Sequence, residues 1–159
     1  MNIFDIMKLN QKKFHGIKDL LISKLGERVV ISKEHGNETL ELENSDFWMT
    51  VTETELIIGY GINHTHYSED FDNLESGIKQ AFDLLTHRIR TTKQIKGNYI
   101  IKVSTDIEFS KWRFENIGIS RSLFYPFWKK TVTEQSFNEK IIEGSEIKDA
   151  FLNCLFERL

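Results

Sequence analysis

The alternation of apolar and polar residues divides the first half of the chain into one helical and several extended segments. Apolar residues recur at helical spacing from Phe14 to Leu25, with Asn10 as a candidate cap and Gly26 as a stop signal. Four short segments rich in β-branched and aromatic residues follow, at 28–33, 38–43, 47–53 and 56–62. The turns between these segments are so short that neighbouring strands can pair only in antiparallel orientation. The pattern predicts a helix followed by a four-stranded meander.

The second half of the chain likewise contains both helical and extended patterns of apolar residues. A clean amphipathic pattern begins near Asp72 and predicts a helix of about five turns, with this apolar stripe: Phe71, Leu74, Ile78, Phe82, Leu85 and Ile89. Its last turns carry Arg88, Arg90 and Lys93. Strands are expected at 99–103, 112–120 and 123–133, and a final helix has Ser145 as its candidate cap. The predicted order is α-ββββ-α-βββ-α in one α+β domain over residues 1–159.

Composition limits the class of protein. The chain has 159 residues, of which 40% are hydrophobic and 28% charged, and this is typical of a globular domain. No apolar run approaches the ~20 residues that cross a bilayer, and the first residues carry no export signal, so we expect a cytoplasmic location. The single cysteine, Cys154, has no partner for an internal disulfide and falls on an apolar stripe, as inert buried thiols do.

Charge is distributed unevenly along the chain. The formal net charge is −3, yet residues 34–78 hold eleven Asp and Glu and no Lys or Arg, which leaves the remainder at +8. A segment of one sign fits two interpretations. It is either a solvated acidic face or a docking surface for a basic partner.

The most conspicuous short motif runs from Gly59 to Tyr67 and contains His64 and His66. If the strand continues to Tyr67, then Tyr60 and both histidines project to the same side. Two imidazoles at this spacing can share a metal ion, so a metal-dependent hydrolase is the alternative function. A third ligand would have to come from these residues: Glu69, Asp70, His35 or His87. No spacing here matches a zinc signature, and we expect the two histidines to form local hydrogen bonds or part of an interface, with no metal and no cofactor.

Other chemistry finds little support in the sequence. It contains no nucleophile elbow, phosphate-binding loop or dinucleotide-binding turn, so we do not expect this protein to be an enzyme. The back half is basic and holds aromatic residues from Trp112 to Trp128 that could stack on bases. A pI near 6.0 and the acidic segment oppose phosphate binding, and we interpret these aromatics as core and sheet packing. Neither nucleic acid nor a membrane is expected as a partner.

Four stretches between Trp48 and Leu85 occur in a distinctive order: Trp48-Met49-Thr50-Val51, Leu56-Ile57-Ile58-Gly59-Tyr60-Gly61, Asn63-His64-Thr65-His66-Tyr67 and Asp72-Asn73-Leu74-Glu75. This quarter of the chain resembles the small immunity proteins of bacterial polymorphic and contact-dependent toxin systems. The resemblance implies a small cytoplasmic α+β domain, often acidic, that binds a cognate toxin domain and blocks it without catalytic residues of its own.

The charge pattern and the resemblance predict the same kind of protein. We expect an immunity protein, or antitoxin, that binds a basic toxin domain through charge complementarity and aromatic anchors. A structural or adaptor binding module is a further alternative. The predicted surface comprises the outer face of the meander and the loop 63–72. Its carboxylates are Glu41, Glu43, Glu53, Glu55, Glu69 and Asp70, and its anchors are Trp48, Tyr60, His64, His66 and Tyr67.

Overall fold

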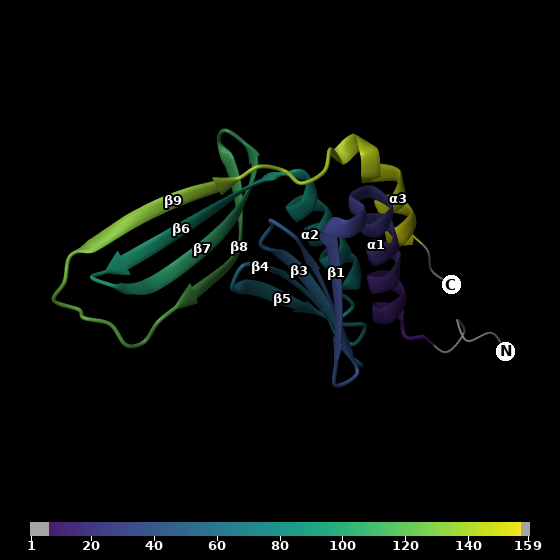
Figure 1. Cartoon of the computed structure of the whole chain (residues 1–159), viewed down its shortest axis with the longest axis horizontal. Coiled ribbons are helices and arrows are strands. Elements are labelled where there is room, and N and C mark those ends of the chain that lie inside the picture. The colour runs from purple at the N-terminus through teal and green to yellow at the C-terminus, as the bar shows by residue number, and fades with distance from the viewer. Residues whose placement is uncertain (1–6, 157–159) are drawn as a thin grey trace.

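The computed structural model describes residues 7–156 and contains, in that range, three α-helices and two antiparallel sheets (Figure 1). The first half consists of α1 (Leu9–Leu25), a short 3₁₀ turn (Gly26–Arg28), β1 (Val29–Glu34), β2 (Asn37–Leu42), β3 (Phe47–Val51), β4 (Leu56–Tyr60) and β5 (Asn63–Tyr67). The second half consists of α2 (Leu74–Thr86), β6 (Arg88–Lys96), β7 (Tyr99–Ser110), β8 (Arg113–Arg121), β9 (Thr131–Asn138) and α3 (Gly144–Phe156). The predicted α+β class is confirmed.

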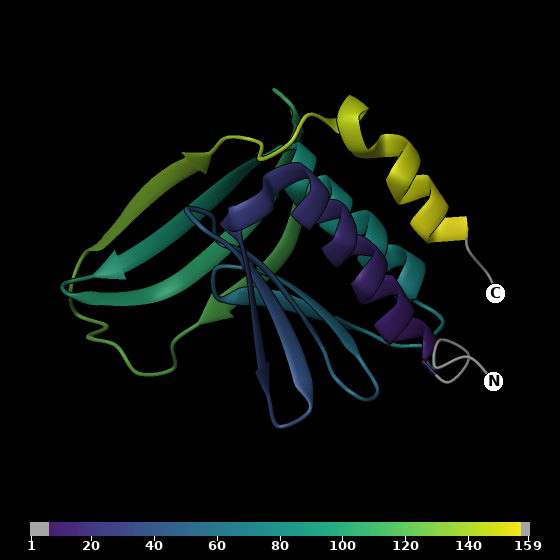
Figure 2. The ribbon, with the colours of Figure 1, turned by 45° about the vertical axis from the view of Figure 1, so that its right-hand side comes forward.

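The core lies between the five-stranded sheet β1-β2-β3-β4-β5 and the helices. Helices α1 and α2 cover one face of this sheet, and α3 packs beside them (Figures 1 and 2). Phe14 and Ile17 of α1 meet Leu40 and Met49 of the sheet, and all four are fully buried. Burial alternates along β2 and β3, as expected when one face packs and the other meets water. No helix of residues 7–156 covers the opposite face of this sheet.

The four-stranded sheet, in the order β8-β7-β6-β9, extends away from the helices as a second layer (Figures 1 and 2). Asn63 at the start of β5 joins the two sheets. Its buried Nδ2 donates to Thr105 Oγ1 at 2.8 Å and to the Val103 carbonyl at 3.4 Å, and Ser120 Oγ donates to its Oδ1 at 2.6 Å. A Cβ at Gly118 would lie 2.9 Å from the Asn63 Cβ, so the close approach of β8 depends on this glycine. The amide of Asn63 is thus a hydrogen-bonded joint between the sheets.

The structure corrects the predicted length of the second helix. Helix α2 ends at Thr86, and the His87 amide donates to the Asp83 carbonyl as the helix terminates. The residues from 88 to 96 instead form β6, which pairs with both β7 and β9. Ile89 is buried, as predicted, but from a strand. Pairing with β7 across a tight turn and with the distant β9 outweighs a local helical period, since burial and ladder hydrogen bonds come from the partner strands.

Two further strand predictions are corrected. The fourth strand ends at Tyr60, and a turn at Gly61–Ile62, with Gly61 at φ 59°, starts the separate strand β5. The meander therefore has five strands. In the last predicted strand, 123–133, residues 122–130 form a loop and β9 begins at Thr131. The aromatics of that loop were expected in the core, yet the structure exposes Phe124, Phe127 and Trp128 by 72% or more.

In residues 7–156, no helix is both long and apolar enough to cross a membrane.

Candidate functional site

The uncovered face of the five-stranded sheet, which we call the outer face, is defined by strand register. One row across it contains Val30, Glu41, Trp48, Gly59 and His64, each paired with the next. The neighbouring row, two residues along each strand, contains Ser32, Thr39, Thr50, Ile57 and His66. Four predicted site residues therefore share this face: Glu41, Trp48, His64 and His66.

Trp48 is fixed flat on this face by a glycine. A Cβ at Gly59 would lie 2.1 Å from the indole Cε2, so only glycine leaves room for the ring. The indole Nε1 donates to the Gly61 carbonyl at 2.9 Å. The ring centroid of His64 lies 5.6 Å from that of Trp48, and His66 follows 5.2 Å from His64. The outer face thus carries a pre-positioned row of three aromatic side chains.

A groove of about 570 Å³ runs beside the indole and is lined by three carboxylates. Glu41 and Glu43 were predicted as partner-binding residues, and Asp46, between β2 and β3, completes the set. No Lys or Arg lines the groove, and among residues 7–156 no hydrogen bond or ion pair involves the carboxylates of Glu41 and Glu43. We call this feature, with Trp48 as its wall, the acidic groove. Three negative charges beside an indole face can bind a guanidinium or ammonium group.

Asp46 was not among the predicted site residues, although it lies in the acidic segment. It precedes β3 in a turn, and sequence spacing assigns such a residue to neither face of the sheet. Its position depends on the β2–β3 turn, in which Asn44 has a φ of 59° and the Asp46 carbonyl accepts a hydrogen bond from the Gly61 amide at 2.8 Å. Its Oδ2 also accepts a hydrogen bond from Asn138 Nδ2 at 3.3 Å, so it contacts β9 as well.

The remaining predicted carboxylates lie elsewhere. Glu53 is exposed in the β3–β4 turn and pairs with Lys8 at 3.4 Å, and Glu69 lies in a hollow with Lys8 and Lys12 near the start of α1. Asp70 is exposed in the loop before α2. Local lysines therefore compensate part of the charge that the sequence placed on one surface.

Tyr60 and Tyr67 were predicted as anchors, and the structure places both on the inner side of the sheet. Tyr60 is 3% exposed, and its hydroxyl accepts a hydrogen bond from Asn138 Nδ2 at 2.9 Å. Tyr67 packs against Gly77 of α2, and its hydroxyl donates to Gln80. Burial raises the pKa of both phenols. Tyr60 shares the inner face with Leu56 and Ile58 of β4, and the turn at Gly61, which pairs Tyr60 with Asn63, places His64 on the opposite face.

The histidine pair has a hydrogen-bonding role on the outer face. His66 Nδ1 lies 2.9 Å from Glu55 Oε2, which places the predicted residue Glu55 at the edge of this face. Within residues 7–156, no three His, Cys, Asp or Glu side chains are arranged to hold one metal ion. The described geometry therefore gives the hydrolase alternative no ligand set.

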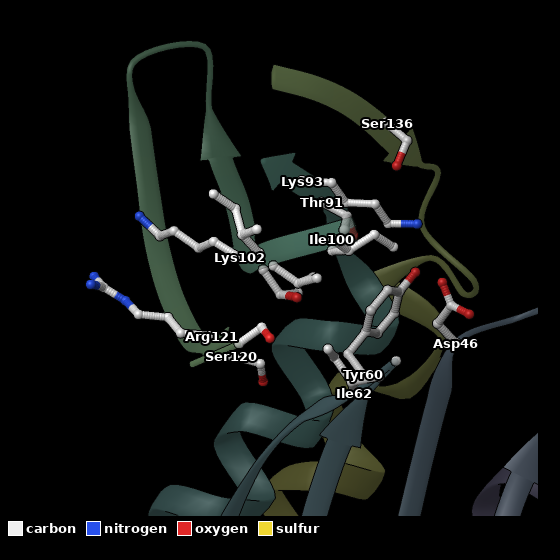
Figure 3. Close-up of a pocket in the computed structure, with 15 residues that line it drawn as sticks. Asp46, Tyr60, Ile62, Thr91, Lys93, Ile100, Lys102, Ser120, Arg121 and Ser136 are labelled. Carbon is white, nitrogen blue, oxygen red and sulfur yellow. The ribbon is translucent and has the colours of Figure 1, made fainter. Parts of the chain in front are cut away.

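A second concave feature, which the sequence did not predict, lies between the two sheets (Figure 3). This cleft of about 520 Å³ is lined by hydroxyl, apolar and basic side chains. Lys93 points toward Tyr60 and Asp46, whereas Lys102 and Arg121 point away from them (Figure 3). The cleft is bordered by the Asn63 joint, since Val103, Thr105 and Ser120 line it. Only the fold brings these strands together.

Comparison with known proteins gives no relative from which a function could be transferred. No protein-family model, no curated protein and no solved structure matches the chain. The functional argument therefore depends on the residues themselves.

Proposed function

We propose that this protein is an immunity protein that binds a basic bacterial toxin domain through its acidic groove. The observation that carries the proposal is the groove itself, whose described lining includes Glu41, Glu43, Asp46 and the indole of Trp48 and no basic side chain. A Lys or Arg of the partner that enters this groove gains both ion pairing and a cation–π contact.

The geometry also supports tight binding. Alanine scans of interfaces find that Trp, Tyr and Arg dominate binding energy when they are rigidly held and surrounded by other contacts. Trp48 is held by Gly59 and by its hydrogen bond to Gly61, so little side-chain freedom is lost on association. His64 and His66 extend the contact area along the same face. The resemblance between residues 48 and 85 and toxin-immunity proteins supports the same function.

A toxicity-rescue experiment tests this function. Each reading frame that flanks the gene is expressed in a bacterial host with and without this chain, and we expect one product to be toxic alone and tolerated with it. Association of the two purified proteins is then followed at low and at moderate salt. Absence of any toxic product, or toxicity that this chain does not relieve, would contradict the proposal.

Charge reversal locates the surface. Glu41→Lys/Glu43→Lys should slow association by about tenfold and flatten its salt dependence, because steering by these charges is lost. Glu53→Lys/Asp70→Lys is the matched control, since it changes the net charge equally outside the groove and should slow association by less than about threefold. Equal effects of the two double variants would remove the groove from the interface.

A further inference from the structure

A second surface lies at the far end of the four-stranded sheet, away from the helices. There the β6–β7 turn and the loop between β8 and β9 lie together (Figures 1 and 2). We call residues 96–100 and 121–130 the distal tip. Five of its large apolar side chains are 58% to 87% exposed: Tyr99, Leu123, Phe124, Phe127 and Trp128. Exposed apolar residues gathered in one place, rather than scattered singly, mark an interaction surface.

The loop of the distal tip is held in shape. Ser122 N donates to the Ile101 carbonyl at 2.9 Å, and Lys129 N donates to the Pro126 carbonyl at 3.1 Å, which closes a turn. Lys96 Nζ reaches from β6 and donates to the carbonyls of Phe127 and Lys129, at 3.3 and 3.1 Å. The exposed side chains are therefore presented by an ordered backbone, and docking needs little further ordering.

Charge on the distal tip has one sign. The two stretches contain Lys96, Arg121, Lys129 and Lys130 and no Asp or Glu. At the opposite end of the same sheet, positive charge is paired instead, since Arg88 contacts Glu108 and Arg90 contacts Asp106. The acidic segment 34–78 belongs to the other sheet and its loops, so the molecule has a basic end and an acidic body. This dipole would turn the distal tip toward any negatively charged surface.

We propose that the distal tip binds the surface of an anionic lipid bilayer. Leu123, Phe124 and Trp128 enter the headgroup region, where aromatic side chains are favoured, and the surrounding lysines meet lipid phosphates. This inference is independent of the acidic groove, which lies on the other sheet. It also departs from the sequence-based expectation of no membrane partner, which was based on the lack of a long apolar run, whereas these aromatics were expected in the core.

The shape of the tip favours a bilayer over a nucleic acid. Proteins that stack bases present ring faces along a groove or sheet that follows the strand. Here four of the five exposed apolar side chains come from a single loop, Leu123 offers no stacking surface, and the rings of Phe127 and Trp128 make a T-shaped contact with centroids 5.2 Å apart and planes at 86°, so the two rings do not form one continuous platform. Exposed apolar side chains and basic residues on the same two short stretches match a flat anionic surface into which the apolar side chains can insert.

Vesicle sedimentation with the full chain tests the proposal. The probes are vesicles of phosphatidylcholine alone and vesicles with about 30% phosphatidylserine. We expect binding to the anionic vesicles, weakened by salt, with a blue shift of tryptophan emission as Trp128 leaves water. No binding to the anionic vesicles, or equal binding to the neutral ones, would overturn the proposal.

Variants at the two ends of the sheet locate the binding surface. Phe124→Ser/Trp128→Ser and Lys129→Glu/Lys130→Glu should each lower the partition coefficient by about tenfold or more. The matched controls are Trp112→Ser and Lys111→Glu in the β7–β8 turn, where Trp112 is 86% exposed beside a lysine but lies at the other end of the sheet. They should bind as the wild type does. Unchanged binding by the tip variants would refute the assignment.

Two further measurements separate other occupants. If the wild type binds fluorescent oligo(dT) and not the vesicles, and the tip variants lose this binding, the surface is a nucleic-acid site and the lipid proposal is wrong. If sedimentation equilibrium shows a dimer that the tip variants convert to monomer, a second copy covers the tip and the proposal is likewise wrong. A monomer that binds only the anionic vesicles supports it.

Discussion

Replacement of Asn63 by alanine should weaken the connection between the two sheets. Three hydrogen bonds of this buried amide are lost, to Thr105, Val103 and Ser120. At about 1 kcal/mol for each bond, the variant should lose about 3 kcal/mol of unfolding free energy. The Thr105 hydroxyl is itself buried and loses its amide donor, which keeps the loss from falling much below this value.

Chemical denaturation followed by circular dichroism measures the loss, and two variants bracket it. Ser120→Ala removes one of the three bonds and should cost about 1 kcal/mol. Asn116→Ala is the burial control, because Asn116 also makes several hydrogen bonds, among them one to Ser104 Oγ at 2.8 Å, but lies exposed on β8. It should cost less than about 1 kcal/mol, since water replaces the lost partners. An Asn63→Ala variant no less stable than Asn116→Ala would refute the idea that this amide joins the sheets.

Two smaller predictions concern the outer face and a buried ion pair. Gly59→Ala should displace the Trp48 indole, red-shift its fluorescence emission and lower the free energy of unfolding by about 1 to 3 kcal/mol. The control Gly144→Ala, whose Cβ would meet nothing closer than 3.7 Å, should leave the stability nearly unchanged. Unchanged emission in Gly59→Ala would contradict the packing of the indole on Gly59. At Glu38, burial raises the carboxyl pKa, but the Lys18 hydrogen bond at 2.7 Å and the charges of Lys18 and Lys33 outweigh burial and hold the pKa below 4.5. This carboxylate therefore stabilises the fold fully above about pH 4.5 and loses that contribution as the pH falls through its folded pKa. Lys18→Met should therefore lower the free energy of unfolding at neutral pH, and the difference from the wild type should become smaller in acid. A deficit that stays constant in urea titrations from neutral to acidic pH would contradict the pairing.

The sequence predicted the local elements well where one face of an element is buried over several residues. The apolar stripe of α1, its stop at Gly26 and the alternation of Leu40 and Glu41 in β2 all follow from periodicity, and the structure confirms them. The same period placed Tyr60 on one face with His64 and His66, which is wrong because the turn at Gly61 separates them; the helix stripe, its stop and the β2 alternation are the features that the sequence predicted correctly. These features depend only on residues near each other in the chain.

The sequence could not predict features that depend on distant partners. Helix α2 stops at Thr86 because β6 pairs with β7 across a tight turn and with β9, which begins only at Thr131, and the pairing with β9 is not contained in any local pattern. Tyr60 faces inward with Leu56 and Ile58 of β4, whereas the turn at Gly61 pairs Tyr60 with Asn63 and so exchanges the face of the residues that follow, which places His64 and His66 on the outer face. A single two-residue turn thus decided which predicted anchors reach the outer face.

The sequence by itself determined most of the element types, with β6 and residues 122–130 as exceptions, the alternation of buried and exposed positions in β2 and β3, and the separation of acidic from basic segments. Only the tertiary structure decided that three of the acidic residues line one groove while others meet the lysines of α1, that Asn63 joins two sheets, and that the aromatics of residues 122–130 lie in water. The physical reason is the same in each case. Periodicity shows which side of an element is apolar, but whether another part of the chain covers that side depends on contacts between residues far apart in the sequence.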